Sequence, residues 1–141
     1  MKLLLAVDGS ASSRRAVAQA VALAAELRAA PEIHLLHVHP ESPDARVRQH
    51  VPHGDLERYY RDESLPHLAE AEAALNAAGL DFKRHLHVGD AAGIIAKLAA
   101  ELGCARIVMG THGRSALAEA VLGSVSHRVL QLASCPVLLV K

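Results

Sequence analysis

Short apolar runs alternate with stretches of helical periodicity along this chain of 141 residues. Five runs, each bounded by turn residues, predict β-strands: Leu3 to Val7, Ile33 to Val38, Phe82 to Val88, Ile107 to Met109 and Val137 to Val140. The stretches between them carry apolar residues at helical spacing: Val17, Val21, Ala24 and Leu27; Leu65, Leu68 and Leu75; Ile94, Ile95, Leu98, Ala99 and Leu102; Val125, Val129, Leu130 and Ala133. Apolar strands that alternate with amphipathic helices predict an α/β fold with a parallel sheet covered by helices on both faces.

Residues suited to helix ends support these boundaries: Ser10, Ser12 or Ser13 at the first start, Gly79 at the second end, and Asp90 and Gly103 at the two ends of the third helix. Pro66 leaves two alternatives for the second helix. It occupies the first turn with Ser64 as the cap, or it lies inside a helix that begins near Leu56. The stretch from Pro40 to about Asp55 is rich in proline and charge and predicts a long loop.

The length and composition of the chain limit the number of domains and the kinds of partner that are expected. One domain spanning residues 1–141 is expected, with 51% apolar and 21% charged residues. Fifteen Lys plus Arg balance fifteen Asp plus Glu, and only three residues are aromatic, so neither nucleic acid nor an anionic membrane is an expected partner. No apolar stretch has the length of a membrane span or signal peptide, and Cys104 and Cys135 predict buried core thiols, which together favour a cytoplasmic location.

The segment most informative about chemistry begins where the fourth predicted strand ends. Gly110 and Gly113 lie three residues apart, and Gly123-Ser124 follows at the predicted start of the last helix. Glycines let main-chain N–H groups approach an anion closely, and a helix N-terminus adds further N–H donors. No Gly-Lys-Ser or Gly-Lys-Thr supplies a phosphate lysine, so backbone groups and serine would carry a phosphate, with Arg114 or Arg128 in support. Ordinary glycine turns are the competing interpretation.

Asp8 stands at the end of the first predicted strand, followed by Gly9-Ser10. Its carboxylate belongs to the same edge of the sheet as the glycine segment and can accept hydrogen bonds from an adenine or a ribose. The alternative role for Asp8 is to cap the first helix.

At these motifs the chain resembles the ATP-binding branch of the universal stress protein family, over nearly its whole length. The resemblance is carried by the segments 7–10, 35–38, 88–89, 108–115, 122–125 and 135–140, and the family's nucleotide signature is met by Gly110, Gly113, Gly123 and Ser124. It implies an open, Rossmann-like sheet of the adenine nucleotide α-hydrolase type, with strand order 3-2-1-4-5. ATP, with Mg²⁺, would bind across the switch point between the first and fourth strands.

The resemblance also implies roles for single residues and a mode of assembly. Asp8 and the backbone of Val38 would contact the adenine end, and Ala6 and Met109 would line the pocket. The ribose and phosphates would be held by Gly110, Gly113, Arg114, Gly123, Ser124, Val125 and Ser126. The family implies a homodimer through the last strand, Val137 to Val140. Ala105 departs from the acidic residue that many members carry at that position, and the loop from Pro40 to Asp55 matches nothing specific in the family.

Two further functions compete with nucleotide-responsive binding. The pairs His37 with His39 and His85 with His87 each share one face of a strand, but a metal site would need more ligands in fixed geometry, and no metal ligand is assigned. A slow ATPase or a phosphotransferase that phosphorylates itself would use the same pocket, with His112 or Ser124 near the phosphates. Because no recognisable base accompanies an acceptor site, no catalytic residue is assigned and a regulatory protein is the preferred interpretation.

Overall fold

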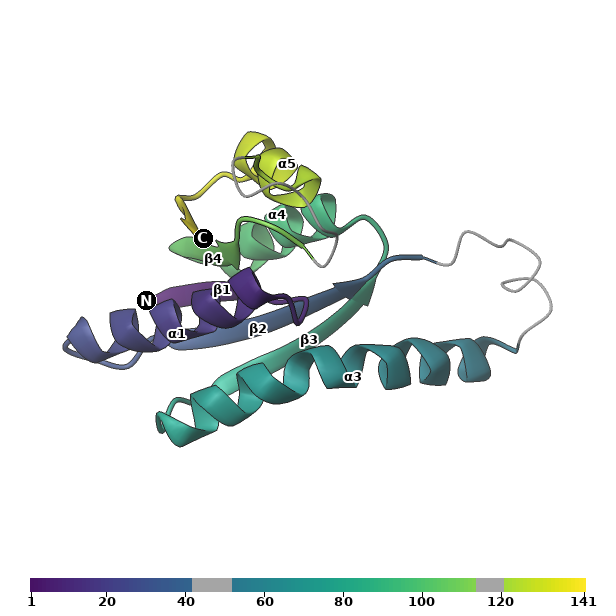
Figure 1. Ribbon diagram of the computed structural model, residues 1–141, viewed down its shortest axis with the longest axis horizontal. Coiled ribbons are helices and arrows are strands. Elements are labelled where there is room, and N and C mark those ends of the chain that lie inside the picture. The colour runs from purple at the N-terminus through teal and green to yellow at the C-terminus, as the bar shows by residue number, and fades with distance from the viewer. Residues whose placement is uncertain (42–51, 114–120) are drawn as a thin grey trace.

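A five-stranded parallel sheet forms the centre of the computed structural model, which describes residues 1–41, 52–113 and 121–141 (Figure 1). The strands are β1 (Lys2–Ala6), β2 (Glu32–His39), β3 (Phe82–Val88), β4 (Arg106–Gly110) and β5 (Val137–Val140). Their spatial order is β3-β2-β1-β4-β5, and every neighbouring pair is parallel. The fold class and strand order predicted from the sequence are confirmed, and each strand end differs from its predicted position by one residue at most.

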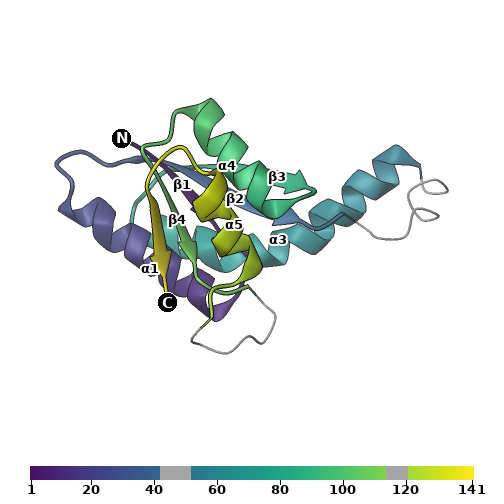
Figure 2. The same cartoon turned by 90° about the horizontal axis from the view of Figure 1, so that it is seen from above.

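Helices cover both faces of the sheet, as the pattern of apolar residues predicted. They are α1 (Ala11–Glu26), α3 (His53–Ala77), α4 (Ala91–Leu102) and α5 (Ser124–Leu132). The views in Figures 1 and 2 place α1 and α3 against one face, and α4 and α5 against the other. Leu4 belongs to the core under α4 and α5, and Leu5 to the core under α1 and α3. Successive strand residues point to opposite faces, so a strand buried on both sides must be apolar throughout.

The helix ends follow the local signals in the sequence. Ser10 caps α1 by accepting a hydrogen bond from the N–H of Ser13 at 3.2 Å, and Asp90 caps α4 in the same way through the N–H of Gly93. Gly103 ends α4 in the left-handed conformation, with φ at +69°, where glycine carries no Cβ penalty.

The long helix α3 settles the position of Pro66. The helix begins at His53 and Pro66 lies in its interior, so the alternative with Ser64 as the cap is wrong. The last three residues of the predicted loop, from His53 to Asp55, form the first turn of α3. Residues 42–51 of that loop lie outside the described residues.

The histidines of β2 and β3 do not gather in one place. The register sets His85 opposite Leu36 and not opposite His37. His37 therefore lies on the α3 side, with its ring centroid 5.0 Å from that of His67, while His85 Nε2 lies 2.8 Å from Nδ1 of the buried His34. In the part of the chain that the structure describes, no group of three or more His, Cys, Asp or Glu side chains is arranged to hold a metal ion.

The burial of His85 beside His34 makes the stability of the fold depend on pH. Burial, and then the charges of His34, His87 and Lys83, lower the pKa of His85 below the usual value of an imidazole. The unfolded chain takes up this proton near pH 6.5, and the folded chain does so only at a lower pH. The free energy of unfolding is therefore expected to fall as the pH drops below about 6.5.

Replacing His85 with glutamine should remove part of this pH dependence. Urea denaturation of both proteins, at about pH 7.5 and about pH 5, measures the difference. The variant is expected to lose less stability between the two pH values than the wild type. An equal loss in both proteins would contradict the role of His85.

The prediction of buried core thiols is confirmed for Cys104, which is buried, and is only partly met by Cys135, which is half-buried. Both are free, and burial raises the pKa of the Cys104 thiol. Within the described ranges, no helix combines the length and the apolar character needed to cross a bilayer.

Candidate functional site

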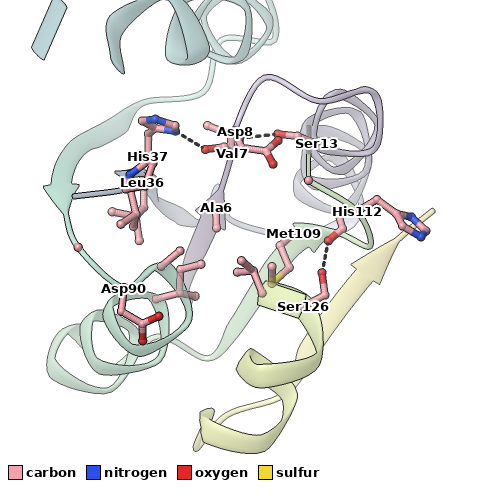
Figure 3. Close-up of a pocket in the computed structure, with 18 residues that line it drawn as sticks. Ala6, Val7, Asp8, Ser13, Leu36, His37, Asp90, Met109, His112 and Ser126 are labelled. Atoms are coloured by element: carbon pink, nitrogen blue, oxygen red, sulfur yellow. Dashed lines mark hydrogen bonds between the residues drawn. The ribbon is translucent and has the colours of Figure 1, made fainter. Parts of the chain in front are cut away.

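A cavity of about 490 Å³ opens at the carboxyl ends of β1, β2 and β4 (Figure 3). The strand order reverses between β1 and β4, and this switch point is where open parallel sheets bind their ligands. The described residues that line the cavity are Ala6, Val7, Asp8, Ser13, Leu36, His37, Val38, Pro40, Gly89, Asp90, Ala91, Ile95, Met109, Gly110, His112, Gly113, Val125 and Ser126. Its volume lies within the usual range for small-molecule sites.

One part of the cavity wall is apolar. Its side chains come from the carboxyl halves of strands and from the first two turns of two helices: Ala6, Leu36, Val38, Met109, Ile95 and Val125. These residues come from β1, β2 and β4 and from α4 and α5, so the sheet and the helix layer on one of its faces form this wall. Such a surface offers favourable burial for the flat faces of a heterocycle.

Asp8 follows the end of β1 and lines the cavity without capping a helix. Its Oδ1 accepts a hydrogen bond from the N–H of Ser10 at 2.9 Å, and its own N–H donates to Ser13 Oγ at 3.1 Å. The N-cap of α1 is Ser10, so the capping role considered for Asp8 is wrong. The first hydrogen bond fixes the Asp8 carboxylate at the cavity, and the second fixes the Asp8 backbone.

The turn after β4 is held between α1 and α5. Ser12 Oγ donates to the carbonyl of His112 at 2.7 Å, and the N–H of Gly123 donates to the carbonyl of Thr111 at 2.8 Å. Ser126 Oγ lies 2.9 Å from the carbonyl of Gly110 and 3.1 Å from that of Thr111. Because a hydroxyl has one proton, Ser126 uses its proton to hold α5 on this turn.

Helix α5 presents its first turn to the same region without a side-chain cap. Its N-cap is Gly123, which has no side chain, whereas α1 and α4 are capped by Ser10 and Asp90. The first N–H groups of a helix have no partners within the helix. In α5 these belong to Ser124 and the residues that follow it, and they provide donors and a partial positive charge for an anion.

His112 lies in the turn with both ring nitrogens engaged. Nε2 contacts the carbonyl of Val121, so Nε2 carries the proton, and Nδ1 then accepts from the hydroxyl of Thr111 at 2.9 Å. In Figure 3 the imidazole points away from the cavity. The ring therefore links Thr111 to Val121 and is not arranged to accept a proton from a ligand in the cavity.

The structure brings together most of the site residues predicted from the sequence. Eight line the cavity: Ala6, Asp8, Val38, Met109, Gly110, Gly113, Val125 and Ser126. Gly123 and Ser124 are not among the lining residues, although they begin the helix that borders the cavity. Arg114 lies outside the described residues.

Ten of the lining residues were not assigned as binding residues from the sequence, although His112 was placed near the phosphates in the competing enzyme interpretation: Val7, Ser13, Leu36, His37, Pro40, Gly89, Asp90, Ala91, Ile95 and His112. Most of them lie at strand ends or in the first turn of a helix. The rule that ligands bind beyond the carboxyl ends of parallel strands points to those that directly follow a strand, such as Val7, Pro40 and Gly89, but not to Ser13 or Ile95, which lie inside helices.

Known proteins resemble this chain over its full length. The model of the universal stress protein family matches residues 1–141. Universal stress protein YxiE of Bacillus subtilis is 36% identical, over 99% of this chain and 98% of the relative. The structure of the Methanocaldococcus jannaschii protein MJ0577 superposes with a TM-score of 0.85 and 30% identity, over 99% of this chain and 94% of that chain. A universal stress protein in complex with cAMP has a TM-score of 0.73 and 25% identity, over 100% and 97%.

Proposed function

The chain belongs to the universal stress protein family, and from this premise we propose that it binds an adenine nucleotide, ATP in particular, and acts as a nucleotide-responsive regulatory protein. The observation that carries the proposal is the uncapped N-terminus of α5 beside a cavity with an apolar wall. An adenine needs apolar surface for its faces, and phosphates need N–H donors. The related protein in complex with cAMP supports the choice of an adenine nucleotide.

The nucleotide would lie with its base toward β2 and its phosphates toward α5. Ala6 and Met109 would pack on the base and ribose, the backbone of Val38 would bind the adenine edge, and Asp8 would accept a hydrogen bond from the base or the ribose. The turn with Gly113 and the first N–H groups of α5, including that of Ser124, would hold the phosphates.

Mg²⁺ would be bound mainly by the phosphates of the nucleotide and by water, and not by a separate set of protein ligands. Mg²⁺ keeps several waters and is usually bound by one or two carboxylates together with substrate phosphates. Asp8 and Asp90 are the carboxylates among the described lining residues. Asp8 Oδ1 is engaged with the N–H of Ser10, which leaves Oδ2 to face such an ion.

The arrangement favours regulation over catalysis. Phosphoryl transfer needs a group that orients or deprotonates a nucleophile. The sequence places His112 or Ser124 near the phosphates, and both ring nitrogens of His112 are engaged within the turn. We therefore propose that the output of nucleotide binding is a change in the turn and helix that border the cavity, which partners recognise.

The proposal is tested by identifying any nucleotide that the protein carries. Freshly purified protein is denatured and the supernatant analysed by chromatography, and the emptied protein is then titrated with ATP and GTP in a calorimeter. We expect ATP or ADP at close to one per chain, or saturable binding of ATP that GTP does not match. No adenine nucleotide in either experiment would refute the proposal.

We also propose that two copies pair through β5. This strand forms one edge of the sheet, where unpaired backbone groups invite a further strand. Exposed apolar side chains gather nearby, with Leu130 46%, Leu132 50% and Leu138 36% exposed. A homodimer would cover both the strand edge and these side chains.

Replacing Leu138 with glutamate should convert the dimer to a monomer, because the charge would be buried against its own copy across the twofold axis. Analytical ultracentrifugation gives the mass directly. Tyr59→Glu is the control, since Tyr59 is 51% exposed on α3, and it should leave the dimer intact. A wild-type protein that sediments as a monomer would refute the proposed dimer.

A further inference from the structure

An ion pair at the rim of the cavity joins α4 to α5. Arg128 Nη1 donates to Asp90 Oδ1 at 2.6 Å, and Nη2 donates to Asp90 Oδ2 at 3.1 Å. This bidentate geometry fixes the orientation of the guanidinium relative to the carboxylate. Asp90 lines the cavity and is the N-cap of α4. Arg128 lies one turn after Ser124, on the helix whose N-terminus borders the cavity.

The chain around Asp90 is built to keep this carboxylate in place. Its Oδ2 also accepts a hydrogen bond from the N–H of Gly93 at 3.2 Å. A Cβ on residue 93 would lie only 2.8 Å from the same oxygen, so a side chain larger than that of glycine would displace the carboxylate. Hydrogen bonds from the Arg128 guanidinium hold the pKa of Asp90 below its usual range, so the carboxylate is charged at neutral pH.

The lining of the cavity carries negative charge, so the ion pair between Arg128 and Asp90 affects how the cavity binds phosphates. Among the described lining residues, Asp8 and Asp90 are carboxylates and none is lysine or arginine. A sphere of 490 Å³ is about 10 Å across, which is about one Debye length at 0.1 M salt. If Asp90 had no cationic partner, its charge would add to that of Asp8 and repel a polyphosphate inside the cavity, more strongly with each phosphate.

We propose that Arg128, by neutralising Asp90, is the residue that allows this cavity to accept a nucleoside di- or triphosphate in preference to a monophosphate. The inference rests on the proposed function and specifies the class of nucleotide. Arg128 acts here as a positioning and charge-compensating residue, because it contacts Asp90 and not the cavity itself.

The ion pair contributes little to folding, which makes the inference testable. The two side chains are 49% and 57% exposed, and exposed ion pairs add little to the stability of a protein. Asp90→Asn keeps a side-chain oxygen that can cap α4. Changes in affinity can therefore be measured in variants that remain folded, with circular dichroism and thermal melting as the check.

The experiment compares the affinities for ATP and AMP in four proteins: wild type, Arg128→Gln, Asp90→Asn and the double variant. Arg128→Gln is expected to weaken ATP binding about fivefold and AMP binding less than twofold, because the exposed carboxylate repels the larger charge more. Asp90→Asn should bind ATP at least as tightly as the wild type. The double variant should bind ATP within about twofold of the wild type, since both charges are gone.

A matched control removes the same charge elsewhere. Arg84→Gln breaks a second bidentate pair, with Glu72, that joins β3 to α3 and includes no residue of the cavity lining. It should leave the ratio of the ATP and AMP affinities unchanged. Raising the salt to about 0.5 M should narrow the difference between Arg128→Gln and the wild type, because screening acts on this interaction.

Two results would overturn the inference. An equal loss of ATP and AMP affinity in both single variants would mean that the pair only ties the helices together. An unchanged ratio of affinities in Arg128→Gln would mean that it has no role in selection. Either result, with a wild type that binds nucleotide, leaves the proposed function standing, whereas a wild type that binds neither nucleotide refutes the function and the inference together.

Discussion

Valine in place of Gly113 is expected to abolish ATP binding and to leave the fold intact. Gly113 lines the cavity, and a Cβ at this position would lie 3.3 Å from Asp8 Oδ2. The two methyl groups of valine would extend into the space proposed for the phosphates and crowd the Asp8 carboxylate. The backbone φ of Gly113 is outside the left-handed region, so steric filling of the cavity is the cause and not strain in the turn.

Calorimetric titration with ATP measures this effect, and the melting temperature and far-ultraviolet circular dichroism monitor the fold. Gly113→Ala is the graded control, because its single methyl needs a shift of only a few tenths of an ångström at Asp8. The alanine variant should bind ATP more weakly than the wild type and more tightly than the valine variant. Wild-type affinity in the valine variant would show that the phosphates are bound elsewhere.

Alanine in place of Gly110 is expected to destabilise the whole protein. A Cβ at Gly110 would lie 2.3 Å from Ser12 Oγ and 2.8 Å from both the carbonyl carbon of Ser12 and the nitrogen of Ser13. Two of these atoms belong to the backbone of α1, which cannot move without leaving the sheet. Overpacking of this kind costs about 3 kcal/mol, and it would also disturb the hydrogen bond from Ser12 to His112.

Urea denaturation gives the free energy of unfolding for this comparison. Gly54→Ala is the matched control, since a Cβ there meets nothing within 4 Å and the residue lies in the first turn of α3. The control should keep the stability of the wild type or gain up to about 1 kcal/mol from the better helix propensity of alanine. Equal stability of the two variants would contradict the close packing of Gly110 on α1.

The elements of the fold could be predicted because each depends on a pattern within a short stretch of chain. Continuous apolar runs mark strands that are buried on both faces, and Leu4 and Leu5 lie in two different cores. Ser10 and Asp90 begin helices, and Gly103 ends one, through contacts with residues three or four positions away. Pro66 was ambiguous because proline is compatible with a first turn as well as with a helix interior that loses one hydrogen bond.

The site was predicted less completely than the fold. Asp8 and the glycines after β4 carried recognisable chemistry, whereas Leu36 and Ile95 are ordinary core residues whose place at the cavity follows from the strand order. The spacing of Gly110 suggested close approach to an anion. The structure adds a second reason for glycine at this position, which is the contact with the first turn of α1.

Local spacing along the chain was thus sufficient for the strands, the helices and the glycine-rich turn, since these depend on backbone hydrogen bonds and on which side of an element is apolar. Contacts between distant segments needed the folded chain. His85 meets His34 and not His37 because of the register of two strands, and Asp90 meets Arg128 because α4 and α5 pack side by side. Register and helix packing are set by the core as a whole, so no single stretch of sequence encodes them.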